Sequence, residues 1–102
     1  MQNNFHPIID KIINVNRGTF VIFFTYDCSY CQKALQLLRN RKVPYKGYNI
    51  NRINGNMQNL LEVLDEYSYI TDFNPNHRSK PIVFLNGKFI GGYNELSNIL
   101  NH

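Results

Sequence analysis

The sequence has no apolar run of about 18 residues, the length that a membrane-spanning helix needs. Its first residues also lack a positively charged segment followed by an apolar one, which is the pattern of a secretory signal. These two absences predict that the protein does not associate with a membrane. They favour a cytoplasmic protein, in which a pair of cysteines stays reducible.

Clusters of one charge sign are also scarce. The chain carries 11 Lys and Arg residues against 7 Asp and Glu residues, a net charge of +4, and only Arg39, Arg41 and Lys42 stand close together. No basic patch alternates with aromatic residues, so the sequence predicts no nucleic-acid partner. A mild positive field is suited to a small anionic partner instead.

Cysteine is limited to Cys28 and Cys31, and histidine to His6, His77 and His102. A zinc site would need further ligands, and the histidines lack the paired spacing that could supply them, so we predict no metal ligands. A disulfide across so short a loop removes little entropy from the unfolded chain and would stabilise the fold weakly. Two unrelated core cysteines are another alternative, because buried cysteine is common.

The position of the two cysteines favours redox chemistry. They follow an apolar run at residues 19–25 and open a segment whose apolar residues recur at helical spacing: Cys31, Ala34, Leu35 and Leu38. A helix N-terminus offers unpaired N–H groups and the positive end of the helix dipole, which favour the thiolate form of a cysteine. We therefore expect an exposed Cys28 that attacks a disulfide and a more buried Cys31 that resolves the mixed disulfide.

With 102 residues, 43% of them hydrophobic, the chain is long enough to bury one core, and we predict a single domain over residues 1–102. The run at 19–25 predicts a central strand buried on both faces, and the dipeptide Asn86-Gly87 predicts a type I′ hairpin. The residue patterns predict, in chain order, a helix over 5–13, the strand at 19–25, a helix that begins at the cysteines, a strand over 45–50, a polar loop over 51–56, a helix over 57–67, a loop over 71–80, strands over 81–85 and 88–90, and a closing helix with Leu96, Ile99 and Leu100 on its apolar face.

Three motifs in this order resemble those of the glutaredoxins, small dithiol proteins of the thioredoxin fold. They are Cys28-Ser29-Tyr30-Cys31, close to the family's C-P-Y-C; Arg78-Ser79-Lys80-Pro81, close to T-V-P; and Gly91-Gly92-Tyr93-Asn94-Glu95, close to G-G-x-x-D. The resemblance spans nearly the whole chain. It implies an α/β, thioredoxin-like fold, a four-stranded mixed sheet flanked by helices in the order α-β-α-β-α-β-β-α.

The resemblance also implies a binding site for glutathione. Pro81 would follow a cis peptide bond beside the active cysteine, and the backbone of Lys80 would pair with the cysteinyl unit of glutathione. Gly92 would allow close approach of the ligand, while Asn94 and Glu95 would serve its γ-glutamyl group at the start of the last helix. The implied set of glutathione-binding residues is Thr25, Tyr30, Lys80, Pro81, Gly92, Asn94 and Glu95.

Two departures from the family pattern concern charge. The family usually carries a lysine three residues before its first cysteine, where this chain has Thr25. Asp27 directly precedes Cys28, and its negative charge opposes thiolate formation. Three basic residues are candidates to supply the missing positive charge, in the order Lys80, Arg78 and Lys33.

We predict a glutathione-dependent thiol–disulfide oxidoreductase that acts as a monomer on protein–glutathione mixed disulfides and protein disulfides. Cys28 would become attached to glutathione, and a second glutathione or Cys31 would release it. Ser29 replaces the motif proline, as in relatives that hold a glutathione-ligated [2Fe–2S] cluster between two subunits, so a cluster-binding glutaredoxin is the alternative. A thioredoxin-fold binding module without turnover is the third possibility.

Overall fold

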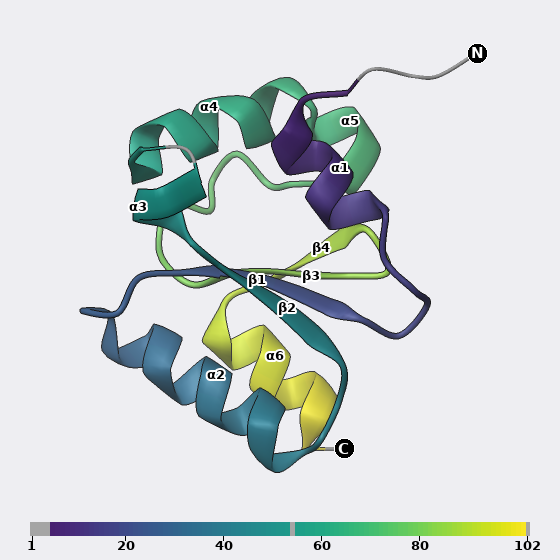
Figure 1. The fold of residues 1–102 in the computed structure, drawn as a ribbon, viewed down its shortest axis with the longest axis vertical. Helices are drawn as coiled ribbons and strands as arrows, with labels where there is room; N and C mark the ends of the chain where they lie inside the picture. The colour runs from purple at the N-terminus through teal and green to yellow at the C-terminus, as the bar shows by residue number, and fades with distance from the viewer. Residues whose placement is uncertain (1–4, 54, 102) are drawn as a thin grey trace.

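The computed structural model describes residues 5–53 and 55–101 of the chain (Figure 1). Its helices are α1 (Pro7–Ile13), α2 (Ser29–Asn40), α3 (Ile50–Ile53), α4 (Met57–Glu66), α5 (Ser68–Thr71) and α6 (Tyr93–Leu100). Its strands are β1 (Phe20–Phe24), β2 (Tyr45–Asn49), β3 (Ile82–Leu85) and β4 (Lys88–Gly91). Within the described ranges, no helix is long and apolar enough to cross a membrane.

The four strands form one mixed sheet in the order β2-β1-β3-β4. β1 pairs with β2 in parallel, and β3 pairs antiparallel with both β1 and β4. All five residues of β1 are buried, as expected of a central strand covered on both faces. The β3–β4 turn has positive φ at Asn86 (54°) and Gly87 (79°), which a type I′ turn requires. The predicted mixed four-stranded sheet and its hairpin are therefore confirmed.

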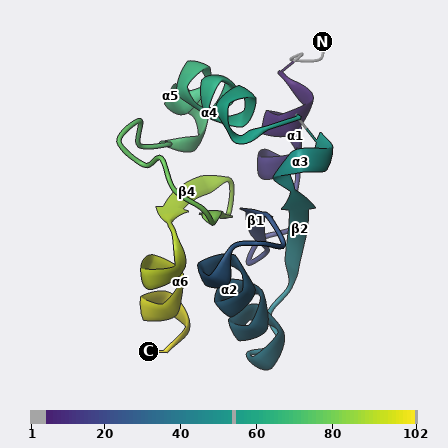
Figure 2. The ribbon, with the colours of Figure 1, turned by 90° about the vertical axis from the view of Figure 1, so that its left-hand side faces the viewer.

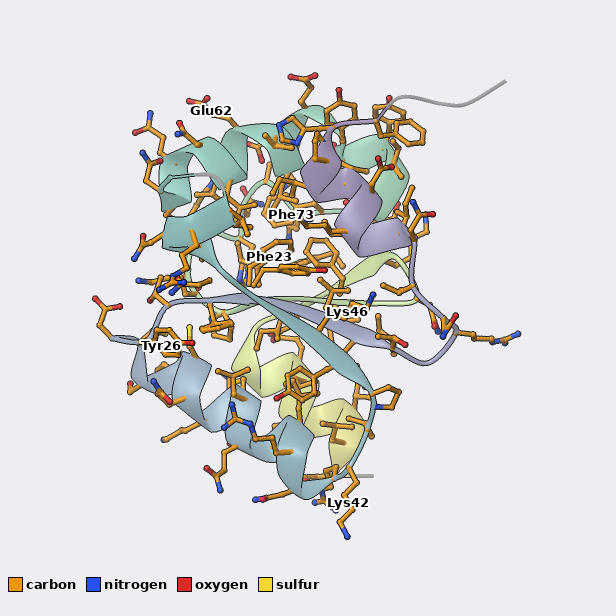
Figure 3. All side chains as sticks on the ribbon, viewed as in Figure 1. Phe23, Tyr26, Lys42, Lys46, Glu62 and Phe73 are labelled. Atoms are coloured by element: carbon orange, nitrogen blue, oxygen red, sulfur yellow. The ribbon has the colours of Figure 1, made fainter. Side chains whose placement is uncertain are left out.

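The side chains of β1 alternate between two hydrophobic layers because successive residues of a strand point to opposite faces. Val21 and Phe23 pack with α1, α4 and Phe73 on one face, while Ile22 and Phe24 pack with α2 and α6 on the other. Figures 1 and 2 show these helices on the two sides of the sheet, with α2 and α6 together on one side. Figure 3 places Phe23 and Phe73 between the sheet and α4, whereas Glu62 points outward. The sheet is thus the middle of three layers.

Two short helices differ from the sequence-based prediction. α3 begins at Ile50, which was expected to end the second strand, and the Ile50 side chain is fully buried in the core. The predicted polar loop over 51–56 therefore starts as helix; Asn54 within it lies outside the described residues. α5 ends at Thr71, a residue expected to begin a loop, and Thr71 is also fully buried. Each helix has only four residues, too few to show an apolar period.

The first and last helices also need correction. α1 begins at Pro7 rather than at residue 5, because Nδ1 of His6 accepts a hydrogen bond from the backbone N–H of Ile8 (3.1 Å) and caps the helix. Ile99 was predicted on the apolar face of α6 but is 42% exposed. The packed face of α6 instead consists of Tyr93, Leu96 and Leu100.

Candidate active site

The sheet topology brings two helix starts and one loop to the same edge of the molecule. β1 and β4 both run antiparallel to β3, so they run parallel to each other. The helices that follow them, α2 and α6, therefore begin at the same edge and lie next to each other (Figure 2). β3 starts where β1 ends, so the loop that leads into β3 reaches this edge as well. The three resembling motifs lie in these three segments.

Cys28 is the N-cap residue of α2, with an extended backbone (φ −106°, ψ 115°). Its Sγ accepts a hydrogen bond from the backbone N–H of Cys31 at 3.1 Å, so the sulfur itself caps the helix. The same sulfur lies 3.8 Å from the carbonyl oxygen of Lys80. Cys28 is half-buried rather than exposed as predicted, because the helix start and the Lys80 segment both cover it. A sulfur held as a hydrogen-bond acceptor at a helix N-terminus is suited to be a thiolate nucleophile.

Cys31 lies one turn into α2 and is fully buried. Burial, followed by the hydrogen bond with Cys28, raises the pKa of the Cys31 thiol from 9.0 to about 12. The nearby charge of Lys80 acts in the opposite direction but is a smaller influence. The two cysteines, both free thiols in this structure, are therefore unequal, and only Cys28 is placed to react first.

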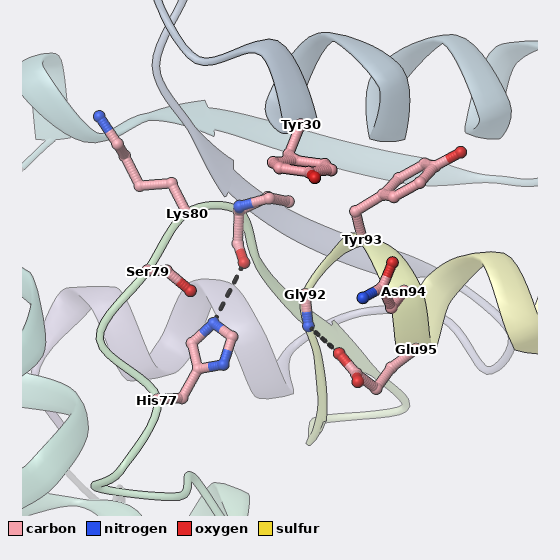
Figure 4. A pocket seen from close by; sticks show the side chains of 9 residues that line it. Tyr30, His77, Ser79, Lys80, Gly92, Tyr93, Asn94 and Glu95 are labelled. Carbon is pink, nitrogen blue, oxygen red and sulfur yellow. Dashed lines mark hydrogen bonds between the residues drawn. The ribbon is translucent and has the colours of Figure 1, made fainter.

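A cavity of about 240 Å³ lies between the start of α2, the start of α6 and Lys80, whose carbonyl oxygen is the one that the Cys28 sulfur approaches (Figure 4). The peptide bond between Lys80 and Pro81 in its wall is cis, as the resemblance implies. The residues that line the cavity are Tyr30, His77, Ser79, Lys80, Pro81, Gly92, Tyr93, Asn94 and Glu95. The structure thus brings together six of the seven implied glutathione-binding residues around this cavity; the seventh, Thr25, does not line it but accepts a hydrogen bond from the Lys80 ammonium.

The start of α6 forms one end of this cavity. The Glu95 carboxylate accepts a hydrogen bond from the backbone N–H of Gly92 at 2.8 Å, which closes the first turn of the helix. A Cβ atom on Gly92 would lie 3.3 Å from the carbonyl oxygen of Pro81 and from the ring of His77, so glycine permits this close approach of three chain segments. The rings of Tyr93 and Tyr30 join α6 to α2 across the cavity, with their centroids 5.9 Å apart.

His77 is a cavity residue for which the sequence analysis predicted no role. Its Nε2 lies 3.3 Å from the carbonyl oxygen of Pro81, and its ring packs edge-on against Phe73 and Phe89. The following residue, Arg78, forms a 2.9 Å ion pair with Asp65 of α4. These tertiary contacts fix the path of the loop. The loop sequence has no hydrophobic period, so no local pattern could have indicated them.

Lys80 is joined to Asp27 through the buried hydroxyl of Thr25. The Lys80 ammonium donates to Thr25 Oγ1 at 3.0 Å, and that hydroxyl donates to Asp27 Oδ1 at 2.7 Å. The Lys80 nitrogen lies 3.9 Å from the same carboxylate oxygen. The hydrogen bond from Thr25, and then the charge of Lys80, lower the pKa of Asp27 below its ordinary value. Among the described residues, no group of three or more His, Cys, Asp or Glu side chains could hold a metal ion.

Comparisons with known proteins agree on one family. The glutaredoxin family model matches residues 20–90. A curated protein called a probable glutaredoxin, from Acanthamoeba polyphaga mimivirus, is 56% identical over 95 residues, which cover 93% of this chain and 90% of that protein. The solution structure of a dithiolic glutaredoxin from Trypanosoma brucei brucei has a TM-score of 0.68 at 25% identity, covering 95% of this chain and 89% of the other. A buckwheat glutaredoxin–glutathione complex has a similar fold, with a TM-score of 0.63 at 22% identity and coverage of 84% and 69%.

Proposed function

The chain belongs to the glutaredoxin family of thiol–disulfide oxidoreductases, and we propose that it uses glutathione to reduce protein–glutathione mixed disulfides and protein disulfides. We propose further that it acts as a cytoplasmic monomer. The observation that carries the proposal is the position of the Cys28 sulfur, which caps α2 and lies 3.8 Å from the carbonyl oxygen of Lys80, where the cis Lys80–Pro81 peptide and the start of α6 line a cavity.

In the first step, the Cys28 thiolate attacks the glutathionyl sulfur of the mixed disulfide. The substrate's S–S bond breaks, the substrate protein leaves as a thiolate, and a new S–S bond joins Cys28 to glutathione. In the second step, the thiolate of another glutathione attacks the bound glutathionyl sulfur. Cys28 leaves as a thiolate and oxidised glutathione is released, so one disulfide is reduced for each disulfide of glutathione formed.

Cys31 provides a second route for release. Its sulfur can attack Cys28 and displace glutathione, which leaves a disulfide between the two cysteines that two further glutathione molecules reduce. Because the pKa of Cys31 is raised to about 12, this attack requires loss of the thiol proton as it occurs. We therefore expect external glutathione to carry most of the turnover on glutathionylated substrates.

The cavity wall has groups that match a short peptide. The Lys80–Pro81 segment lines the cavity, and the Lys80 carbonyl oxygen lies 3.8 Å from the Cys28 sulfur, to which the cysteinyl unit of glutathione would be attached. The first N–H groups of α6 carry no intrahelical partner and can receive a carboxylate, apart from that of Gly92, which Glu95 occupies. The buckwheat glutaredoxin of similar fold is described in complex with glutathione, which supports the same ligand class here.

Two cysteine variants test the proposal. Cys28→Ser should abolish exchange, because it removes the sulfur that attacks the substrate. Cys31→Ser should still reduce a glutathionylated peptide in the presence of glutathione, but should lose most reduction of an intramolecular protein disulfide, for which the second thiol is needed. Initial rates on the two substrates provide the measurement, and equal losses in both variants on the glutathionylated peptide would contradict the assignment.

The cluster-binding alternative predicts a different product of expression. In this chain a cluster would take Cys28 and depend on external thiols for its other ligands, since no grouped ligand set exists among the described residues. Anaerobic purification with glutathione distinguishes the two functions. A colourless monomer with exchange activity supports the oxidoreductase, whereas a brown dimer that exchanges thiols poorly supports cluster binding.

A further inference from the structure

Lys80 and Thr25 lie opposite each other where β3 and β1 meet the active-site edge. The antiparallel register ends with Phe23 opposite Ile82, and the same register continued by two residues would place Thr25 opposite Lys80. The 3.0 Å hydrogen bond between these two side chains agrees with that register. Because Thr25 is only 4% exposed, its hydroxyl is a fixed anchor for the long Lys80 side chain.

Other basic residues of this region are engaged elsewhere. Arg78 pairs with Asp65 on α4. The Lys33 nitrogen lies 5.4 Å from the centre of the Tyr30 ring, over its face. The Lys80 backbone contacts the Cys28 sulfur, while its ammonium is held by Thr25 and Asp27 and points away from α6 (Figure 4).

Two groups that attract anions therefore lie on opposite sides of the Lys80–Pro81 segment, the start of α6 on one side and the Lys80 ammonium on the other (Figure 4). Glutathione carries one carboxylate at each end, on its γ-glutamyl and its glycine residue. If the γ-glutamyl carboxylate lies at α6 and the cysteinyl sulfur at Cys28, the glycine carboxylate lies toward Lys80. A carboxylate already stands there, because Asp27 is 3.9 Å from the Lys80 nitrogen.

Building on the proposed function, we propose that Lys80 binds the glycine carboxylate of glutathione and that Asp27 competes with this carboxylate for the Lys80 ammonium. Asp27 acts through Lys80 and is a positioning residue: it holds the ammonium against Thr25 in the free protein and lowers the affinity for glutathione. The Asp27 side chain is 85% exposed and Lys80 32%, so either carboxylate can occupy the position while the other is solvated.

The competition predicts opposite effects of the two charges. Lys80→Met keeps the length of the side chain and the backbone but removes the cation, so it should weaken recognition of glutathione. Asp27→Asn keeps an oxygen that can accept the Thr25 hydrogen bond but removes the competing charge, so it should strengthen recognition. Both effects should be about two- to fivefold, the size expected for partly exposed ion pairs, and should shrink in high salt.

The test compares two peptide disulfides that differ only in the glycine carboxylate. One peptide carries glutathione and the other carries glutathione whose glycine carboxyl group is a neutral primary amide, and kcat/KM is measured for each with glutathione in fixed excess. The ratio of the two values reports recognition of the glycine carboxylate alone, because any change in the reactivity of Cys28 affects both peptides. Lys80→Met should lower this ratio, Lys80→Arg should restore it, and Asp27→Asn should raise it.

Two controls complete the design. Asp72→Asn breaks another exposed Lys–Asp pair of similar length (3.8 Å, with Lys88) outside the cavity, and should leave the ratio unchanged. In the double variant of Asp27→Asn with Lys80→Met, the ratio should equal that of Lys80→Met alone. The inference would be overturned if Lys80→Met did not lower the ratio. It would also be overturned if Asp27→Asn raised the ratio by the same factor in the Lys80→Met background as in the wild type. Either result would leave the proposed function intact as long as the wild-type protein turns over with glutathione. If the wild-type protein showed no such turnover, the proposed function itself would be refuted.

Discussion

The Cys31 thiol should be almost inert to alkylation in the native protein at pH 7, whereas the Cys28 thiol should react. Full burial, followed by the hydrogen bond with Cys28, raises the pKa of Cys31 from 9.0 to about 12. At pH 7 its thiolate fraction is then about 10⁻⁵, about a thousandfold below that of an ordinary thiol. Since the thiolate is the reactive form, the rate of alkylation should fall at least in that proportion.

The assay is alkylation with iodoacetamide across a pH series, followed by intact mass and peptide mapping. The native protein should gain one label, on Cys28, and the unfolded protein should gain two. In Cys28→Ser, the charge of the neighbouring sulfur is lost while burial remains, so Cys31 should react faster than in the wild type yet far more slowly than when unfolded. Its rate should continue to rise above pH 9.

The same pKa shift has a consequence for stability. The folded state keeps the Cys31 proton at pH values where the unfolded state has lost it, so this residue should reduce the free energy of unfolding as the pH rises from about 9 toward 12. Wild type and Cys31→Ser should therefore converge in that range. Equal labelling of both cysteines at pH 7, or a Cys31 rate that levels off below pH 9, would refute the reasoning.

Two further predictions concern stability. Gly91→Ala should lower the free energy of unfolding by about 1–3 kcal/mol, because φ is +131° there and a Cβ atom would collide with the Glu95 side chain that caps α6. Gly18→Ala is the control: its φ is also positive, but the space around the Cβ is open, so its loss of stability in urea unfolding should be smaller. Equal losses in the two variants would contradict the role of Glu95. Thr71→Val should leave stability unchanged or raise it by up to about 1 kcal/mol, because the buried hydroxyl of Thr71 has no hydrogen-bond partner among the described residues; a fall in the thermal midpoint would show that it has one.

The long elements could be predicted because their residue patterns are local. The continuous run of β1 and the apolar period of α2 each extend over several residues, and the Asn86-Gly87 turn depends on backbone preferences of those two residues. α3 and α5 could not be predicted in the same way. Ile50 packs in the core with residues of α1, β1 and α4, and α5 contacts β4, so both short helices depend on distant parts of the chain.

The site shows the same division between local and distant information. The N-cap position of Cys28 follows from the strand and helix on either side of it, so the sequence could indicate it. The position of His77 depends on Phe73, on Phe89 and on the carbonyl oxygen of Pro81, which meet only when the loop has folded against β4. A sequence-based argument could place the thiols but could not describe the far wall of the cavity.

The register between β1 and β3 explains how this chain departs from the family pattern at one position without leaving its site uncharged. The resemblance implies a lysine where the chain has Thr25, and just beyond the paired ends of β1 and β3 the Lys80 side chain reaches Thr25 in a 3.0 Å hydrogen bond. The Lys80 ammonium therefore stands beside the residue at which the family lysine is missing. Moving the cation to Lys80 leaves Thr25 free to hold it by a hydrogen bond, and it also brings Asp27 within 3.9 Å of the ammonium. With the cation on Lys80 instead of residue 25, the site keeps a positive charge, but Asp27 competes for it. Binding of the glycine carboxylate of glutathione should therefore depend on Asp27 as well as on Lys80.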